Sequence, residues 1–523
     1  MNNKIVVLTG SFNPVTKAHF KILSDAVNFV KADKGLFIAT TNAYLTRKTV
    51  VKAKSRTPFI LSEEARKEML ESLHNENNKL FFGGFEIGGA SPATDKTLNS
   101  VIRNNKGADI YYLCGADKLS SISHWSNIGH MFLSTYILVF SRSDIDVESI
   151  IKSDPFLTKY RHRITIMPTN EDIEDISSTE IRNRFFAGQD YSNLMNPSAY
   201  EIMKRFKPED FKLLTTEDVI EATIKYDGRF GGNTARCIVY KENASLFKNW
   251  NEKRFGNKEE LIKGTRVYNK EFKVYSSNSY ETQFDCQNID CADCALNLIK
   301  QGYNPAILNL ASSVQPCGGY HSGSGAQEES LCQMSTLSVS LYQFAKPSKK
   351  FFKEGGYKVD KSNVYPIETN FGGIYSPNVI FFRNNIDKYY SLRDECFRCS
   401  IVSVPSLAYH CNEMYSTDDT KYFECEGVLN KEGQEVEKNK IRTIYRIALD
   451  NNHDSLVLGA FGCGAYGLNP KQIAELFKEV LLEQEFKNKF KAIVFAIYEG
   501  QGSSRRVVGK EGKFKPFYEI YGK

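Results

Sequence analysis

The stretch KIVVLTGSFNPVTKAH, residues 4–19, decides the fold of the first part of the chain. It opens with a short β-branched strand pattern, and the apolar spacing that follows it is typical of a helix. Gly10 lets the backbone turn tightly after the strand, and Pro14 stiffens the loop. The free N–H groups at the start of the helix can bind phosphate. Thr16 and His19 are separated by one helical turn, so they lie on one side of the helix.

The residues from Lys4 to about Phe206 alternate between short apolar strands and helical stretches. The strand patterns are KIVVLTG, KGLFIAT, ADIYYLCG and TYILVFSR, and the helical patterns include KAHFKILSDAVNFVKA and EEARKEMLESLHNE. This alternation predicts an α/β fold with a mostly parallel sheet and helices on both of its faces. Ligands bind such sheets at the carboxyl ends of the strands.

The chain, at 523 residues, is too long for one hydrophobic core. FKPEDFKLL, residues 206–214, is polar and contains Pro208, so we place the boundary there and predict domains 1–208 and 209–523. Beyond the boundary, AILNLASS, NVIFF, CSIVSV, SLVLGAFG and KAIVFAIY predict buried strands, again with helices between some of them. The second domain is therefore predicted to be α/β as well.

Composition excludes several classes of function. A hydrophobic fraction of 41% is ordinary for a globular protein, and 68 Lys and Arg against 62 Asp and Glu leave a net charge of +6, too dilute to indicate nucleic-acid binding. No apolar run approaches the roughly 20 residues of a membrane span, and the opening MNNKIVVLTG is too short for a secretory signal. We expect a cytoplasmic protein with no membrane or direct nucleic-acid partner, and its twelve cysteines are expected to be thiols.

Five of the cysteines have spacings that allow two interpretations. Cys291 and Cys294 form a C-x-x-C pair, Cys286 lies just upstream, and Cys396 with Cys399 forms a second pair. Four such ligands can bind zinc. In the alternative interpretation, CADCALNLIKQG is an amphipathic helix whose cysteines are small buried apolar residues. We favour the helix and predict no metal site.

Three further segments accompany the glycine loop in the first domain. They are TDKTL at 94–98, CGAD at 114–117 with Trp125 after it, and ISSTEIR at 176–182. Together with GSFNPVTKAH, they resemble nicotinamide/nicotinate mononucleotide adenylyltransferases, whose signatures are G-S-F-x-P-x-[HT]-x-x-H and ISSTxxR. The resemblance covers about Lys4 to Arg205. It implies a Rossmann-like nucleotidyltransferase fold.

The resemblance implies that the 5′-phosphate of a pyridine mononucleotide attacks the α-phosphorus of ATP and that pyrophosphate leaves, giving NAD or its acid form. Positioning and charge neutralisation suffice for this chemistry, and no covalent nucleophile is needed. His19 would donate to the α-phosphate and Arg182 would clamp the β- and γ-phosphates, with Mg²⁺ bridging the phosphates. The other residues implied to bind ATP or the mononucleotide are Gly10, Ser11, Phe12, Thr16, Thr94, Thr97, Gly115, Asp117, Trp125, Ser178 and Thr179.

Each of these residues also has a purely structural interpretation. His19 could be a surface residue at the start of a helix, ISST could be an N-cap with Arg182 in solvent, and Trp125 could serve only in packing. We interpret the basic residues from Arg47 to Arg56 as a solvated loop. TDKTL favours nicotinate as the pyridine, whereas Thr16 in place of a first histidine favours nicotinamide, so the preference stays open.

A second group of motifs occurs in the C-terminal domain. AILNLASSVQPCGGYHSGSGAQEESLC, residues 306–332, predicts a strand, a glycine-rich loop and a helix. Gly318 and Gly319 permit close approach of the backbone to a diphosphate. Glu328 and Glu329 follow the loop, and adjacent residues on a helix point about 100° apart, so the two glutamates must have different roles.

This segment resembles the bacterial-type poly(ADP-ribose) glycohydrolases, a branch of the macrodomains, whose signature is GGG, a short gap and QEE. IYSPNVIFFRN at 374–384 and LVLGAFGCGAYGLNP at 456–470 add to the resemblance, which spans Thr215 to about Tyr498. It implies a macrodomain-like mixed α/β/α sandwich that binds ADP-ribose, ADP-ribosylated protein or polymer. Cys317 stands where the family has the first glycine of its triplet, and this departure puts hydrolysis in doubt more than binding.

By the resemblance, Glu329 would protonate the leaving oxygen at the distal ribose, and Glu328 would hold the hydroxyls of that ribose. The residues implied to bind ADP-ribose are Asn309, Gly318, Gly319, Gln327, Gly459, Gly462, Gly464, Tyr466 and Gly467. The whole chain is thus predicted to be a bifunctional enzyme of NAD metabolism. The alternatives are an adenylyltransferase that carries a non-catalytic ADP-ribose-binding module, and a macrodomain that acts on a small ADP-ribosyl ester.

Overall fold

A computed structural model describes residues 3–86, 93–125, 127–140, 145–168, 176–228, 231–345, 364–409, 419–499 and 512–522. The chain divides into two compact units, Met1–Gly228 and Arg229–Lys523. Helix α11 (Thr216–Tyr226) groups with the first unit. An ion pair of 3.5 Å between Arg47 and Asp227 holds it there, so the division lies C-terminal to residue 208.

The first unit is built on one six-stranded parallel sheet in the order β3-β2-β1-β4-β5-β6. This order reverses direction between β1 and β4, and ligands of doubly wound sheets bind at that point, outside the carboxyl ends of the strands. The parallel sheet predicted from the alternating pattern is confirmed. The strands are β1 (Lys4–Gly10), β2 (Lys34–Ala39), β3 (Leu80–Phe85), β4 (Asp109–Gly115), β5 (Tyr136–Phe140) and β6 (Ile164–Ile166).

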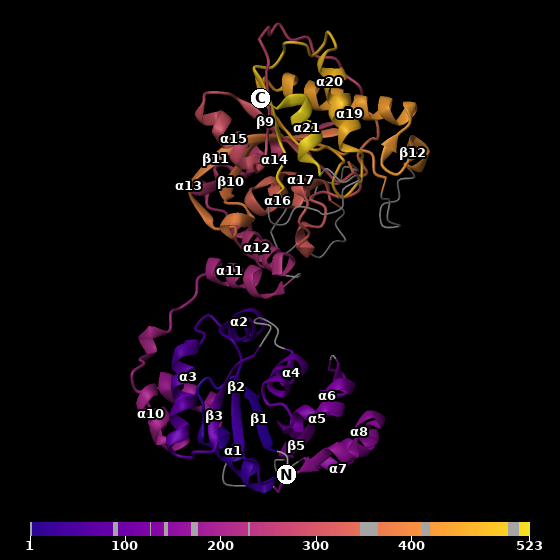
Figure 1. Ribbon diagram of the computed structural model, residues 1–523. Coiled ribbons are helices and arrows are strands. Elements are labelled where there is room, and N and C mark those ends of the chain that lie inside the picture. Colours follow the sequence, from indigo (N-terminus) through magenta and orange to yellow (C-terminus); the bar gives the residue numbers. More distant parts are fainter. Residues whose placement is uncertain are drawn as a thin grey trace. The chain divides into compact units, whose positions relative to one another are not determined.

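Helices cover both faces of this sheet (Figure 1) because successive side chains of β1 point in opposite directions. Val6 and Leu8 pack with α1, α3, α9 and α10, whereas Ile5 and Val7 pack with α4 to α8. The helices are α1 (Lys17–Phe29), α2 (Asn42–Thr46), a π-helix (Arg47–Lys52), α3 (Glu63–Ser72), α4 (Thr94–Asn104), α5 (Ala116–Ile122), α6 (Ile128–Ser134), α7 (Val147–Ser153), α8 (Pro155–Lys159), α9 (Ser178–Phe186) and α10 (Pro197–Met203).

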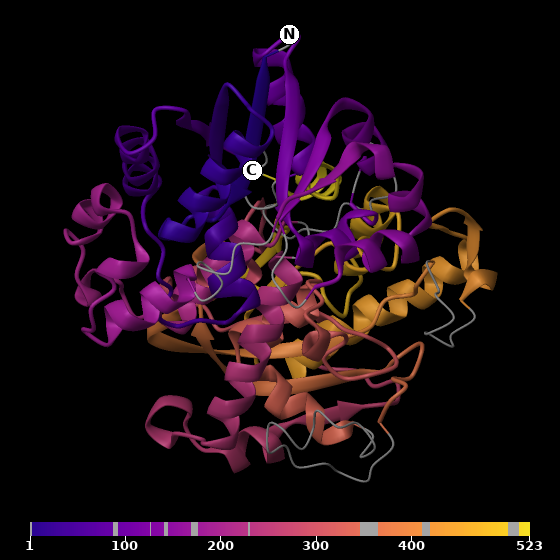
Figure 2. The ribbon, with the colours of Figure 1, turned by 90° about the horizontal axis from the view of Figure 1, so that it is seen from below.

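The second unit contains a mixed seven-stranded sheet in the order β7-β10-β11-β9-β14-β15-β8. β10 runs antiparallel to β7 and β11, and the other neighbouring pairs are parallel. Figure 2 shows the strands of this sheet between the helices of the unit, as expected of the predicted sandwich. The strands are β7 (Arg266–Tyr268), β8 (Gln283–Gln287), β9 (Pro305–Leu310), β10 (Gly373–Arg383), β11 (Leu392–Val404), β14 (Ser455–Leu458) and β15 (Ala492–Ala496), with a separate hairpin of β12 (Phe423–Cys425) and β13 (Val428–Leu429).

One large apolar core joins the central strands of this sheet to α19, α20 and α21. Within the described residues, every helix of the chain is too short or too polar to cross a membrane. The helices of the second unit are α12 (Gly231–Lys248), α13 (Glu252–Phe255), α14 (Lys258–Gly264), α15 (Cys291–Lys300), α16 (Gln327–Met334), α17 (Leu337–Leu341), α19 (Lys431–Asp450), α20 (Pro470–Leu481) and α21 (Phe514–Tyr521).

Candidate functional sites

The loop between β1 and α1 holds His19 in a defined orientation. Thr16 is the N-cap of α1, and its hydroxyl accepts a hydrogen bond from the backbone N–H of His19 at 3.2 Å. The Nδ1 atom of His19 in turn accepts from the backbone N–H of Thr16 at 3.1 Å. Because Nδ1 is an acceptor, the proton of the neutral ring is on Nε2. The capping interpretation of His19 is therefore compatible with its use as a donor.

The surroundings of His19 keep its ring uncharged. Burial lowers the pKa of His19 to about 4, and the positive charge of Lys118 contributes to the shift. The ring of Phe12 packs edge-on against His19 with the centroids 5.0 Å apart. A side chain at Gly10 would meet the Phe12 ring at 2.9 Å, so this close packing requires glycine.

The two adenylyltransferase-like signatures of the first unit meet in space. Nη1 of Arg182 donates to the carbonyl oxygen of Asn13 at 2.9 Å, and the Ser178 hydroxyl donates to the carbonyl oxygen of Pro14 at 2.8 Å. Nη2 of Arg182 donates to the Thr179 hydroxyl at 2.9 Å. The helix cap itself is Ser177, whose hydroxyl accepts from the N–H of Glu180. The ISST segment thus caps α9 and also joins it to the glycine loop.

Two further cations, Lys48 and Lys118, lie near this junction. Lys48 lies on the π-helix Arg47–Lys52, so the first part of the segment expected to be a loop is helical, whereas Lys48, Lys52, Lys54 and Arg56 are exposed, as a solvated segment requires. The pKa of Lys48 is lowered by burial and by the positive charges of Arg182 and Lys118. Lys118, in the first turn of α5, is exposed. Three positive charges therefore act on one another beside His19, and a polyanion would relieve their repulsion.

Several residues implied for the mononucleotide surround Tyr112 of β4. Thr94 begins α4, and its side chain is a hydrogen-bond partner of the Tyr112 hydroxyl. The ring of Trp125 packs edge-on toward Tyr112 with the centroids 6.4 Å apart, and it also borders the apolar core. Thr97 is buried on α4. Glu86, which sequence reasoning missed, follows β3; its burial raises its pKa to about 7.

The connection from β4 to α5 contains the residues that the resemblance implies hold a ribose. Gly115 ends β4 and is the N-cap of α5. Asp117 is exposed in the first turn of that helix. Ser11 offers its carbonyl oxygen to Nη1 of the buried Arg66 at 3.0 Å, so it is fixed through its backbone.

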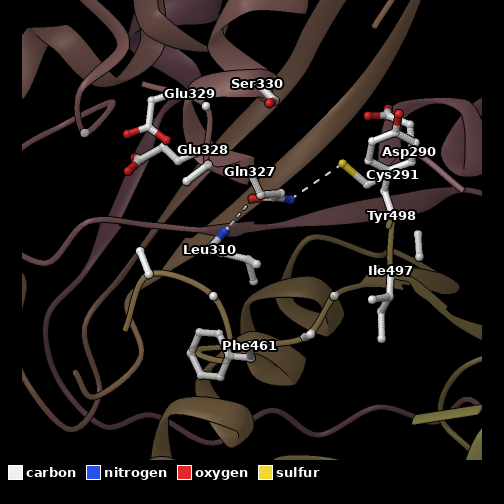
Figure 3. Close-up of a pocket in the computed structure, with 18 of the residues that line it drawn as sticks. Asp290, Cys291, Leu310, Gln327, Glu328, Glu329, Ser330, Phe461, Ile497 and Tyr498 are labelled. Atoms are coloured by element: carbon white, nitrogen blue, oxygen red, sulfur yellow. Dashed lines mark hydrogen bonds between the residues drawn. The ribbon is translucent and has the colours of Figure 1, made fainter. Parts of the chain in front are cut away.

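The second unit contains a cavity of about 500 Å³ at the carboxyl end of β9. Figure 3 shows Glu328 and Glu329 on one side of it and Asp290, Cys291 and Tyr498 on the opposite side. The cavity is lined by segments that are far apart in the sequence, from Arg236 to Lys513. Its lining includes, of the residues implied to bind ADP-ribose, Gly318, Gln327, Gly459, Gly462, Gly464 and Tyr466.

The two glutamates differ in how their carboxyl oxygens are bound. Glu328 accepts hydrogen bonds from the backbone N–H of Ser312 at 2.7 Å and of Cys317 at 3.2 Å, and from Nδ2 of Asn309 at 3.3 Å. Glu329 accepts from the N–H of Gly319 at 2.8 Å through one oxygen, and its Oε2 is buried with no hydrogen-bond partner. Burial raises the pKa of both carboxyl groups, and their mutual repulsion adds to the shift of Glu328.

Cys317 does not narrow the cavity. Its side chain is fully buried, and its thiol is a hydrogen-bond partner of the Cys332 thiol. The residue has a φ of +61°, in the left-handed region that favours glycine. Gly318, next to it, borders the cavity, whereas Cys317 does not. Cys317, which replaces the first glycine of the triplet, thus directs its thiol into the core. The wall of the cavity at this point is formed by the neighbouring Gly318.

Several residues implied to bind ADP-ribose shape the cavity without facing it or through contacts with the backbone. Asn309, Gly319 and Gly467 do not border the cavity. Gln327 borders it, but its side chain is bound to the C-terminal end of β9, where it donates to the carbonyl oxygen of Leu308 and accepts from the N–H of Leu310. At the position of Gly462, which has a φ of +71°, a side chain would collide with the hydroxyl of Ser406. This contact requires glycine in the second loop.

Asp290, Tyr498 and Lys513 are among the polar residues of the cavity that the motifs did not predict. Asp290 is the N-cap of α15, and burial raises its pKa to about 6. Tyr498 donates to the carboxylate of Asp387 at 2.6 Å. Lys513 lies beside the glycine loop of Cys463, and burial lowers its pKa. No periodicity could have found these residues, since they lie in the connection before α15 and in the connection between β15 and α21.

The cysteines follow the helical interpretation. Cys291 and Cys294 are buried on α15. The Cys291 sulfur accepts a hydrogen bond from Nε2 of Gln327 at 3.6 Å. In the described part of the chain, no group of three or more His, Cys, Asp or Glu side chains is placed to hold a metal ion.

Comparison with known proteins gives a family for each unit. Residues 7–184 match the family "Cytidylyltransferase-like", and residues 239–384 match "Microbial-type PARG, catalytic domain". A protein of Clostridium tetani (strain Massachusetts / E88) named "Probable nicotinate-nucleotide adenylyltransferase" is 26% identical over 205 residues, which are 39% of this chain and 97% of that protein. A protein of the same name from Clostridium botulinum (strain Okra / Type B1) is 31% identical over 206 residues, covering 39% of this chain and 96% of that protein.

Two solved structures resemble the second unit. Poly(ADP-ribose) glycohydrolase from Thermomonospora curvata has 21% sequence identity and a TM-score of 0.39, covering 54% of this chain and 98% of that one. Poly(ADP-ribose) glycohydrolase from Deinococcus radiodurans, in complex with ADP-ribose, has 23% identity and a TM-score of 0.37, covering 51% and 97%. By its relatives and family matches, the chain belongs to the nicotinate-nucleotide adenylyltransferase family through its N-terminal unit and carries a microbial-type PARG catalytic domain in its C-terminal unit.

Proposed function

We propose that the N-terminal unit transfers the adenylyl group of MgATP to nicotinate or nicotinamide mononucleotide, which yields a dinucleotide and pyrophosphate. The observation that carries this proposal is the bond between Arg182 and the carbonyl oxygen of Asn13, which brings the second signature to the loop of the first. His19 leaves the same loop with its Nε2 proton available for donation. An attacking phosphate and a triphosphate must be held in line, and these groups surround the place where they would meet.

The charges around this place suit the reaction. Arg182, Lys48 and Lys118 supply positive charge for the triphosphate. Nε2 of His19 donates to a non-bridging oxygen of the α-phosphate as negative charge builds up there. The Mg²⁺ that arrives with ATP would be coordinated by phosphate oxygens and water, because the described residues provide no cluster of protein ligands.

The test is to incubate the full-length chain with MgATP and each mononucleotide separately, and to measure pyrophosphate and dinucleotide by chromatography. Formation of both products from at least one mononucleotide is expected, and the ratio of kcat/KM values gives the preference for acid or amide. Product formation from neither mononucleotide would overturn the proposal. His19→Ala is the negative control for contaminating activity.

We propose that the C-terminal unit hydrolyses ADP-ribosyl linkages and releases ADP-ribose. The observation that carries this proposal is Oε2 of Glu329, a buried carboxyl oxygen with no partner at the wall of the cavity. Glu329 would donate its proton to the leaving oxygen as the bond from the ribose C1″ atom breaks. Water then adds to C1″ and returns a proton to the carboxylate. The glycine loops would wrap the diphosphate.

The test is release of ADP-ribose from poly(ADP-ribose) and from ADP-ribosylated protein by the full-length chain, beside calorimetric binding of free ADP-ribose. Release from either substrate is expected. Binding without release from both would replace the proposal by the alternative of a non-catalytic ADP-ribose module. The position of the Cys317 side chain, away from the cavity, favours hydrolysis over that alternative.

The two activities concern one chemical object, an adenosine diphosphate joined to a ribose. ADP-ribosyl polymers are made at the expense of a dinucleotide of the type that the first unit would produce. We propose that one chain thus removes the modification and restores the dinucleotide. The pairing is tested by measuring both activities in one preparation.

A further inference from the structure

Arg236 is a buried arginine at the wall of the cavity that contains the paired glutamates. It lies on α12 and is 7% exposed. The guanidinium donates to two neutral oxygens, the carbonyl of Gly323 at 2.8 Å and the side chain of Asn233 at 2.6 Å. These bonds fix the group without neutralising its charge. Arg236 precedes residues 239–384, the segment that matches the glycohydrolase family. The motifs that carry the resemblance in this unit therefore do not include it.

The guanidinium supports the glycine-rich loop from one side. A Cβ atom at Gly325 would lie 2.6 Å from Cζ of Arg236. The loop therefore rests directly on the guanidinium between Gly323 and Gly325, and glycine leaves the room that this contact needs. Arg236 and Gly323, whose carbonyl oxygen it binds, are 87 residues apart in the sequence. The contact ties α12 to the loop.

The same loop binds the carboxyl group of Glu329. The N–H of Gly319 donates to Oε1 of Glu329, and α16 begins at Gln327, just after the loop. A displacement of the loop would therefore move both the bound oxygen and the first turn of α16. Arg236 borders the cavity together with Glu329, and its charge also acts directly on that carboxyl.

We propose that Arg236 is a positioning residue of the hydrolytic site: it fixes the glycine-rich loop and stabilises the carboxylate that Glu329 becomes when its proton leaves. The proposal rests on the hydrolase function proposed above. As the bond from C1″ to the leaving oxygen breaks, Glu329 gives its proton to that oxygen. Water adds to C1″ and returns a proton to Glu329. A nearby fixed cation favours the intermediate carboxylate and makes the group a stronger acid.

The other groups that face Glu329 do not provide this charge. Glu328, its neighbour on α16, is a carboxyl group and repels a second negative charge. Cys317 from the loop and Cys332 from α16 are buried thiols whose pKa values are raised by burial, so they stay neutral. Burial raises the pKa of Glu329, and Arg236 is the cation that opposes this shift.

The experiment compares full-length wild type with Arg236→Gln, Arg236→Lys and Lys241→Gln. Lys241 is exposed on the same helix, so its variant removes one positive charge without touching the loop. The readouts are kcat and KM for release of ADP-ribose from polymer between pH 5 and 9, and the calorimetric Kd for free ADP-ribose. Thermal unfolding and the Kd report whether the second unit is folded.

In Arg236→Gln, we expect kcat to fall about tenfold at its plateau, because a weaker acid transfers its proton more slowly. The basic limb of the profile should move to higher pH by about one unit, since removal of a nearby opposite charge raises the pKa of a carboxyl group. Kd should rise by no more than about twofold, since the loop loses one support while the second glycine loop still binds the diphosphate. Arg236→Lys should restore the position of the limb but only part of kcat, because lysine lacks the fork that binds Gly323 and Asn233.

Two outcomes would overturn the inference while leaving the proposed function intact. If wild type releases ADP-ribose and Arg236→Gln has the same profile as Lys241→Gln, Arg236 does not act on Glu329. If Arg236→Gln raises Kd and KM beyond the expected limit without moving the limb, the arginine binds the ligand instead. Failure of wild type itself to release ADP-ribose would be failure of the proposed function.

Discussion

Arg182 and Asn13 are 169 residues apart in the sequence, and Nη1 of the arginine donates to the carbonyl oxygen of the asparagine at 2.9 Å. Asn13 is itself held from the other side, since its side chain donates to the carbonyl oxygen of Phe59 at 2.6 Å and accepts from the N–H of Leu61 at 3.0 Å. The glycine loop is therefore clamped between α9 and the segment before α3. Its geometry depends on contacts that lie outside the loop.

Replacement of Arg182 should weaken ATP binding more than it lowers the rate. Arg182→Ala removes a charge and a charge-assisted hydrogen bond worth about 1.5–3 kcal/mol, so KM for ATP should rise about ten- to hundredfold. Arg182→Lys should recover part of this loss, because lysine keeps the charge but cannot bind Asn13 and Thr179 together. Steady-state kinetics with varied ATP measure the effect.

Arg184 provides a matched control on the same helix. Its guanidinium forms an ion pair of 2.7 Å with Glu180 at the surface of α9. Arg184→Ala should change KM for ATP little, because an exposed pair of this kind contributes about 0–1 kcal/mol and does not touch the loop. Equal effects of the two alanine variants would mean that Arg182 contributes only to the stability of α9.

Lys118 should contribute to ATP binding through its charge alone. Lys118→Gln is expected to raise KM for ATP about fivefold at low salt, since one exposed charge pair is worth about 1 kcal/mol in water. The effect should fade as salt increases. Lys52→Gln is the control, because Lys52 is exposed at the far end of the π-helix. A salt-independent loss would contradict the electrostatic role.

His19 should be a neutral donor in the free enzyme over the physiological pH range. His19→Ala should lower kcat by about two to three orders of magnitude, the loss typical of one donor to developing charge. Because burial holds the pKa of His19 at about 4, kcat/KM should show no titration of this ring near its ordinary value of about 6.5. His130→Ala, on the exposed side of α6, is the control. A loss of only a few-fold would assign His19 to capping alone.

The order of strands and helices could be predicted because each element has its own local pattern of apolar residues. Apolar alternation in KIVVLTG sends Val6 and Leu8 to one core and Ile5 and Val7 to the other, and this is a property of the strand itself. The place of α11 could not be predicted in the same way. It is set by long-range contacts that no local pattern encodes, among them the ion pair of Arg47 with Asp227 and the bonds from Arg56 to Thr215 and Thr216.

The residues of the candidate sites also differ in whether local sequence patterns could reveal them. His19, Arg182 and the paired glutamates stand in contiguous motifs, so their residue types and spacing indicate phosphate and glycosidic chemistry. Lys118 follows the CGAD motif in the sequence, but only the fold brings it beside His19, and only the fold brings Arg236 beside the glycine-rich loop. The direction of the Cys317 side chain depends on a positive φ, which the sequence does not reveal.

Glu329 and Glu328 should respond differently to conversion to glutamine. Glu329→Gln removes the proton donor and should lower release of ADP-ribose by about two to four orders of magnitude while Kd for ADP-ribose is retained. Glu328→Gln should reduce the rate less but lower thermal stability, because an amide cannot accept from Ser312, Cys317 and Asn309 as the carboxylate does. Equal losses of rate with equal stability would mean that the two residues share one role.

The hydrolysis rate of wild type should fall as pH rises. Glu329 must carry a proton to act as the acid, and burial raises its pKa above the ordinary value for glutamate. The proton is therefore present below the raised pKa and is lost above it. A rate that increases steadily from pH 5 to 9 would exclude Glu329 as the proton donor. The adenylyl transfer of the same preparation serves as the control for general inactivation.

Replacement of Cys317 by glycine should leave the hydrolysis rate unchanged. The thiol lies in the core beside Cys332 and does not border the cavity, so its removal neither opens the wall nor moves the oxygen of Glu329. Stability should change little as well, because relief of a left-handed conformation gains about 1 kcal/mol and loss of a small buried group costs a similar amount. Cys317→Ala separates these contributions, since alanine keeps the strain and loses the thiol. An increase of kcat/KM of tenfold or more in Cys317→Gly but not in Cys317→Ala would show that a Cβ atom at this position restrains the loop of the active site.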